Sequence, residues 1–172
     1  MADLLSDFAS DRGPGLAARS ARALVARPES FGSSRHRMLV GAGLVLRVVS
    51  AGLVATIGII HLHLWLEGYR EIATIGPLFM LNAIAGILLA ALLLFWPRLL
   101  AGLLAIGFVA SALGALLISI NVGLFGFREF TSVAFVMPSI VIESIAIVTL
   151  VAWMVVVAIM LKGASTGSER TR

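Results

Sequence analysis

The sequence predicts an all-α integral membrane protein, a bundle of four transmembrane helices with both termini in the cytoplasm. Of its 172 residues, 60% are hydrophobic and 13% are charged, a charged fraction about half that of a soluble domain. A soluble core of this size cannot bury so much apolar surface, so lipid is the expected solvent. The apolar residues also gather into four runs, each long enough to cross a bilayer of about 30 Å. The basic residues lie mainly on one predicted side of the membrane.

Residues 1–37 are predicted to form a cytoplasmic basic tail, mostly disordered, because they are polar and contain several glycines and prolines. The alternative prediction for residues 16–25 is a short amphipathic helix on the membrane surface. Either form would attract anionic lipid headgroups. The tail holds six arginines: Arg12, Arg19, Arg22, Arg27, Arg35 and Arg37.

The membrane domain is predicted to cover residues 38–162, followed by a polar cytoplasmic tail over 163–172. Each span is expected to be a helix of about 20 residues or slightly more, the length that crosses the hydrocarbon layer. The third span carries Gly107, Ser111 and Ala115 at every fourth position, a pattern that lets a second helix approach closely. The approximate spans are 44–66, 77–96, 99–123 and 138–161.

The orientation follows from the distribution of arginine and lysine, which is enriched in cytoplasmic segments. One side carries the six tail arginines with Arg98, Lys162, Arg170 and Arg172, whereas the other side carries Arg70 and Arg128. Both termini are therefore expected in the cytoplasm of a multi-pass cell-membrane protein. Arginine outnumbers lysine 12 to 1, which favours a bacterial inner membrane. The layout resembles that of small four-helix integral membrane proteins of bacteria.

One strongly polar residue in each span falls at about the same depth near the outer face. These are His61, Asn82, Asn121 and Glu143. The first, second and fourth lie roughly 7–8 Å from the outer ends of their spans, and Asn121 lies about one helical turn before Phe125. Polar side chains at such depth are costly in contact with lipid and usually point into the bundle. We therefore expect these four residues to form one interior polar cluster.

The favoured interpretation of this cluster is structural. A protonated Glu143, hydrogen-bonded to an asparagine or histidine, would join helices with about 0.6–2 kcal/mol per bond. The chain would then be a non-enzymatic structural or accessory protein without a cofactor. Its partners would be the lipid bilayer and either other membrane subunits or a second copy of the chain.

The first alternative is a metal or redox-cofactor site for copper, haem or quinone, with His61, His63 and Glu143 as candidate metal ligands. The spacing limits this alternative, because positions i and i+2 of a helix differ by about 200°. Both histidines therefore bind one ion only where the helix unwinds. The remaining histidine, His36, lies in the predicted tail, so a two-histidine haem site would have to be shared across a homodimer.

A small-solute transporter is the second alternative, and it requires polar groups through the whole depth of the membrane. The inner half offers few of them: Arg47, Ser50, Thr56, Ser111 and Thr149.

The outer loops carry the charged residues Glu67, Arg70, Glu71, Arg128 and Glu129, whose default role is solvated ion pairing. The sequence contains no cysteine, which excludes disulfides and thiolate sites. It shows no phosphate-binding or nucleic-acid motif, so no nucleic-acid partner is expected.

Overall fold

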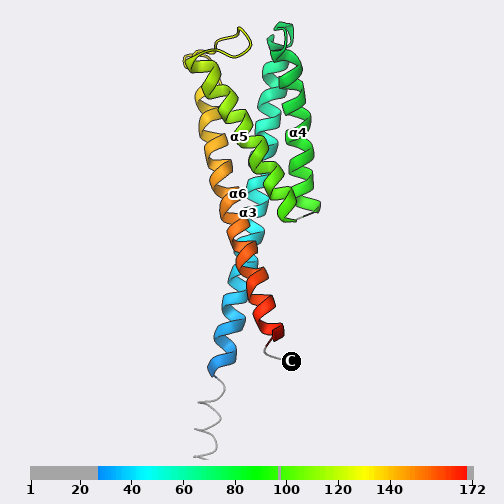
Figure 1. Ribbon diagram of the computed structural model, residues 1–172, viewed down its shortest axis with the longest axis vertical. Helices are drawn as coiled ribbons and strands as arrows, with labels where there is room; N and C mark the ends of the chain where they lie inside the picture. The colour runs from blue at the N-terminus through cyan, green and yellow to red at the C-terminus, as the bar shows by residue number, and fades with distance from the viewer. Residues whose placement is uncertain (1–26, 97, 170–172) are drawn as a thin grey trace, which may run out of the picture. The chain divides into compact units, whose positions relative to one another are not determined.

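The computed structural model describes residues 27–96 and 98–169, and side chains within 34–96 and 98–163. Regular structure in these ranges is helical: α3 (Arg27–Leu66), the short 3-10 helix η1 (Tyr69–Glu71), α4 (Ile75–Phe95), α5 (Leu99–Asn121) and α6 (Val136–Glu169) (Figure 1). Four of these helices are long and apolar enough to cross a membrane. The predicted all-α class is therefore confirmed, and four candidate spans are consistent with a multi-pass membrane protein.

The chain divides after Val40 into two units. The described part of the first unit belongs to α3, which is helical from Arg27 through the predicted first span 44–66. Residues 27–37, which were predicted to belong to the tail, are thus helical. The remaining tail, with its expected surface helix and headgroup contacts, lies outside the described residues. At the other terminus, α6 continues through Glu169, past the predicted end of the last span.

The second unit holds the core, which is built from small and branched apolar residues on all four long helices. Alanines at helical spacing let the helices approach, and larger residues such as Leu93 and Trp153 fill the space between them. The outward faces carry exposed large hydrophobic side chains, including Leu88, Leu100 and Val148. A core of small apolar residues with large apolar side chains on the outer faces is expected of a bundle surrounded by lipid.

Two glycines allow a close contact between helices in the second unit. A Cβ added to Gly86 of α4 would lie 2.8 Å from the Cα of Gly58 in α3, so the two backbones touch. The small-residue stripe of α5 does not serve this purpose, because a Cβ on Gly107 would meet nothing within 4 Å. A close approach of two backbones therefore occurs between α3 and α4, and α5 contacts α6 closely at Gly102, where a Cβ would lie 2.8 Å from Cζ3 of Trp153.

The connections at one end of the second unit position the functional residues. The α3–α4 connection, which contains η1, and the α5–α6 loop both lie at this end (Figure 1), which we call the η1 end. Gly68 adopts a φ of 133° just before η1, a conformation that only glycine reaches freely. A Cβ on Gly76 would lie 2.6 Å from the carbonyl oxygen of Arg70. Glycine at position 76 thus lets η1 fold tightly against the start of α4.

Candidate functional site

A cavity of about 240 Å³ opens at the η1 end between the four long helices. Its wall is mainly apolar, with residues such as Ile60, Ile75 and Leu116 contributed by different helices. Apolar walls with a few placed polar groups are typical of small-molecule sites. The polar side chains of the lining are His61, Tyr69, Asn82, Ser111, Ser119, Glu129, Ser139 and Glu143.

Glu143 is the most unusual member of the lining. Its side chain belongs to α6, is only 1% exposed, and has a carboxylate oxygen, Oε2, without a hydrogen-bond partner in the described part of the chain. The hydroxyl of Ser119 on α5 is buried in the same unpartnered state. A buried polar group without a partner costs about 1–3 kcal/mol by protein mutational data. The cavity therefore contains hydrogen-bonding capacity that the described residues leave unused.

His61 presents one free ring nitrogen. Its Nδ1 lies 2.9 Å from the carbonyl oxygen of Ile57, and since a carbonyl only accepts, Nδ1 must carry the hydrogen. Nε2 of the neutral ring therefore keeps its lone pair as an acceptor. The ring also contacts Phe79 of α4, with centroids 5.0 Å apart.

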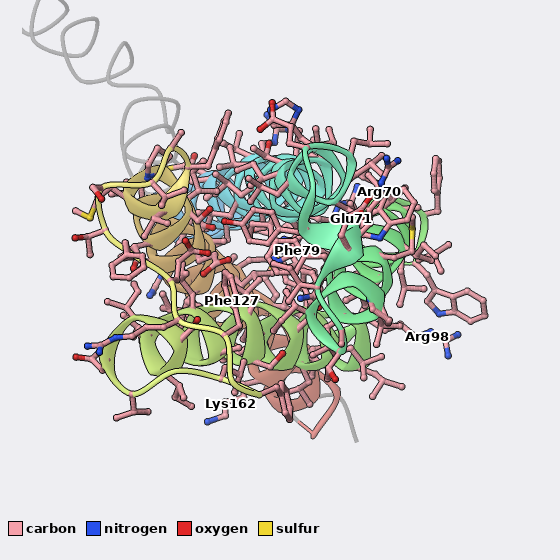
Figure 2. The ribbon with its side chains drawn as sticks, turned by 90° about the horizontal axis from the view of Figure 1, so that it is seen from above. Arg70, Glu71, Phe79, Arg98, Phe127 and Lys162 are labelled. Atoms are coloured by element: carbon pink, nitrogen blue, oxygen red, sulfur yellow. The ribbon has the colours of Figure 1, made fainter. Side chains whose placement is uncertain are left out.

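Two lining residues of the cavity, contributed by two separate connections, are hydrogen-bonded to each other. The hydroxyl of Tyr69, in η1, donates a 2.9 Å hydrogen bond to Oε2 of Glu129, in the α5–α6 loop. We call this pair the latch. The Tyr69 ring stacks on Phe79 at 4.8 Å and meets the edge of Phe127 at 5.8 Å. Figure 2 shows Phe79 and Phe127 toward the middle of the bundle, with Arg70 displaced to its side.

The electrostatics of the latch favour the hydrogen bond between Tyr69 and Glu129. Burial, the hydrogen bond to Glu129 and the negative charge of that carboxylate all raise the pKa of Tyr69. The phenol therefore stays protonated and remains a donor. Glu129 is itself 7% exposed. Its Oε2 accepts from Tyr69 and its Oε1 accepts from the main-chain N–H of Phe130 at 3.3 Å, so both oxygens of this buried carboxylate have a partner.

No lysine or arginine lines the cavity within the described ranges. Arg70 instead lies 3.4 Å from the neighbouring Glu71. Arg128 donates from its guanidinium to the main-chain carbonyls of Ile120 and Asn121, at 3.5 and 3.4 Å. The lining groups that can carry a charge near neutral pH are thus two carboxyl groups and one histidine.

The predicted polar cluster is brought together in part. His61, Asn82 and Glu143 line the same cavity. Asn121 lies outside it, because its side chain is exposed and its Nδ2 donates to the carbonyl oxygen of Leu117 at 2.8 Å. Ser119 takes the inward position on α5 instead, two residues earlier and therefore on the opposite face of the helix.

The predicted metal ligands are not assembled. His63 is absent from the cavity lining; its Nε2 lies 3.2 Å from Oε1 of Glu67, and its ring meets the edge of Phe135 at 5.1 Å. Across residues 27–96 and 98–169, no group of three histidine, aspartate or glutamate side chains has an arrangement that could hold a metal ion. His36 is exposed near the start of α3. Among the predicted outer-loop charges, Glu129 alone is buried and belongs to the site.

Sequence reasoning missed the latch and the inward serines. Ser139 precedes Glu143 by four residues, so the shared helix face was a usable signal. Tyr69 and Glu129 are 60 residues apart in two connections, and no sequence pattern announces their contact. Comparison of the chain with known protein families, with curated proteins and with solved structures finds no match, so the geometry alone carries the functional argument.

Proposed function

We propose that this chain is a non-enzymatic membrane protein that binds a small organic ligand in the cavity at its η1 end. The observation that carries the proposal is the carboxyl group of Glu143, which is 1% exposed, lines the cavity and has an unpartnered oxygen in the described region. A ligand with a donor group would satisfy that oxygen and offset the cost of burying it.

A purely structural role for Glu143 is less well supported. A carboxyl group that joins helices does so through a hydrogen bond to a neighbouring helix. No such bond from Glu143 is found in the described residues, whereas Glu129 has its bond to Tyr69. The two carboxyl groups of one cavity therefore differ in the property that separates a structural role from a binding role.

A conducting path is also less well supported. Below the cavity the core is mainly apolar, with Val54, Leu93 and Leu150 fully buried. Ser50 is the fully buried polar residue there, and its hydroxyl has no partner in the described residues. Two polar side chains nearby, Thr56 and Thr149, donate to carbonyl oxygens of their own helices. A hydrophobic, well-packed layer is a barrier to ions and water, which favours a closed binding site over a channel.

We also propose that both termini lie in the cytoplasm of a bacterial inner membrane, with the η1 end facing outward. The asymmetry of the arginines supports this orientation. Because the chain has no cysteine, a single introduced thiol reports its side directly. Ser132→Cys in the α5–α6 loop should react with an impermeant maleimide in intact cells, whereas Ser165→Cys should react only after lysis. The reverse labelling would overturn the orientation.

The binding function is tested with phenethyl alcohol, a small apolar molecule with one hydroxyl donor, by equilibrium dialysis against the purified full-length chain in detergent. Ala115→Leu places extra volume on a residue that lines the cavity and should abolish the saturable binding that the unmodified chain shows. Ala110→Leu, exposed on the same helix, is the matched control and should bind normally. Equal uptake by the unmodified chain and Ala115→Leu would overturn the proposed function, because the uptake would then be partition into detergent.

A further inference from the structure

We infer that the ligand of this cavity is an organic cation, a protonated amine on a small apolar body, whose charge is neutralised by Glu143. This inference rests on the proposed function and adds the chemical class of the ligand. It is carried by the signs of the charges that line the cavity, by the direction of its hydrogen bonds and by its aromatic wall.

The charges exclude an anionic ligand. The lining groups that can carry a charge near neutral pH are Glu129, Glu143 and His61, without lysine or arginine in the described ranges. The latch already engages Glu129 through the phenol of Tyr69, which leaves Glu143 as the open carboxyl group. An anion would enter a low-dielectric space beside acidic groups and would lose its hydration without gaining a partner.

The hydrogen-bonding groups favour a donor. The unpartnered Oε2 of Glu143 accepts when the carboxyl group is ionised. His61 offers Nε2 as an acceptor, because its Nδ1–H is committed to the carbonyl oxygen of Ile57 at 2.9 Å. An ammonium group has donors and no acceptor, so it matches two such acceptors better than an alcohol or a carbonyl compound does.

The aromatic wall suits the same ligand. The rings of Tyr69 and Phe79 stack at 4.8 Å, and Phe127 meets Tyr69 at 5.8 Å. Aromatic faces attract cations and also pack against an apolar body. A volume of about 240 Å³ admits one aromatic ring with a short side chain.

The test compares three probes of similar size and different charge: phenethylamine, phenethyl alcohol and hydrocinnamate. Dissociation constants are measured by equilibrium dialysis on the full-length chain, with Ala115→Leu as the background for detergent partition. We expect phenethylamine to bind about 10- to 100-fold more tightly than phenethyl alcohol, the gain of a charge-assisted hydrogen bond. Hydrocinnamate should show no saturable binding.

Two variants assign the charge to Glu143. Glu143→Gln keeps the shape of the side chain and should reduce phenethylamine affinity to that of phenethyl alcohol. Glu67→Gln, on an exposed carboxylate that pairs with His63 outside the cavity, is the matched control and should leave all affinities unchanged. Phe127→Leu changes only the α5–α6 loop, so it tests the aromatic wall even where Glu143→Gln fails to fold. It should weaken phenethylamine binding about 2- to 5-fold and spare phenethyl alcohol.

The outcomes separate the two levels of the argument. If phenethyl alcohol binds as tightly as phenethylamine, the cation assignment is overturned and the binding function stands. If phenethylamine binds equally well to the unmodified chain and to folded Glu143→Gln, Glu143 is not the counter-ion and the assignment fails. If none of the three probes binds above the Ala115→Leu background, the proposed function itself is overturned.

Discussion

Replacement of Glu143 by methionine should stabilise the ligand-free protein. The side chain is 1% exposed and its Oε2 lacks a partner in the described residues, so the carboxyl group contributes a desolvation cost and no compensating bond. That cost is about 1–3 kcal/mol in protein mutational data. Methionine has a similar volume and a flexible, apolar chain that fits irregular spaces. We therefore expect Glu143→Met to raise the free energy of unfolding by about 1–3 kcal/mol.

The same substitution separates the binding role from the structural one. If Glu143 joined helices through a hydrogen bond, its removal would lower the free energy of unfolding by about 0.6–2 kcal/mol. The two interpretations thus predict opposite signs. Glu143→Gln should lie between the extremes, because its amide remains polar and buried while its charge is lost.

The assay is reversible unfolding of the full-length chain in mixed micelles, followed by circular dichroism without added ligand. Ser144→Ala is the matched control, since Ser144 is the adjacent residue, is exposed, and bonds only the carbonyl oxygen of Ile140 in its own helix. That control should change stability by less than about 0.5 kcal/mol. A Glu143→Met protein clearly less stable than the unmodified chain would refute the reasoning, and Glu143 would then be a structural residue.

Three further outcomes are expected. Gly86→Ala should lower the free energy of unfolding by about 1–3 kcal/mol, because its Cβ would lie 2.8 Å from the Cα of Gly58. Gly114→Ala, where the added Cβ meets open space, should not lower it. Equal stabilities of the two variants would contradict the close contact. Tyr69 is the one tyrosine of the chain, so tyrosinate absorbance reports its ionisation alone. Because its pKa is raised in the folded protein, the latch should contribute fully to the free energy of unfolding below about pH 10. That contribution should be lost as the pH rises through the folded-state pKa. Glu129→Gln should lower that midpoint, and an unchanged midpoint would exclude the carboxylate as a cause. Tyr69→Phe should cost about 1–2 kcal/mol in unfolding experiments, less than a fully buried charged hydrogen bond because the ring is partly exposed; no loss would show that the latch is not stabilising.

The membrane class and the rough extent of the helices could be predicted because lipid selects long apolar runs whatever their packing. The first span was predicted to end at residue 66, which is where α3 ends. The third span was predicted to start at residue 99, which is where α5 begins. The depth of a residue also follows from counting along a helix. Depth placed His61, Asn82 and Glu143 at one level, and these three line one cavity.

The direction in which a side chain points was harder to predict, because it depends on which helices are neighbours. Asn121 and Ser119 have nearly the same depth, but they lie on opposite faces of α5, and the serine faces the cavity. Likewise, a stripe of small residues shows where a backbone is accessible, without showing that a partner is present. Gly107 belongs to such a stripe, but a Cβ added there would meet nothing within 4 Å, whereas Gly58 and Gly86 meet across two helices.

The loops were beyond sequence reasoning for a different physical reason. Phe125 and Phe135 adopt positive φ values of 52° and 71°, a conformation that non-glycine residues rarely take. No local propensity predicts it, since tertiary contacts impose it. These loop conformations accompany the placement of Glu129 opposite Tyr69, so the hydrogen bond between these two lining residues is a property of the assembled bundle.

The two carboxyl groups of the cavity act as an internal comparison. Glu129 lies in a connection, where a tyrosine from a distant segment satisfies it at 2.9 Å. Glu143 lies within α6, among side chains from every other long helix, and its Oε2 meets no donor in the described residues. A bundle that can satisfy one buried carboxylate across 60 residues of sequence has the means to satisfy a second. An apolar residue at position 143 would avoid the cost altogether, so the open carboxyl group is best explained by a partner that arrives from outside the chain.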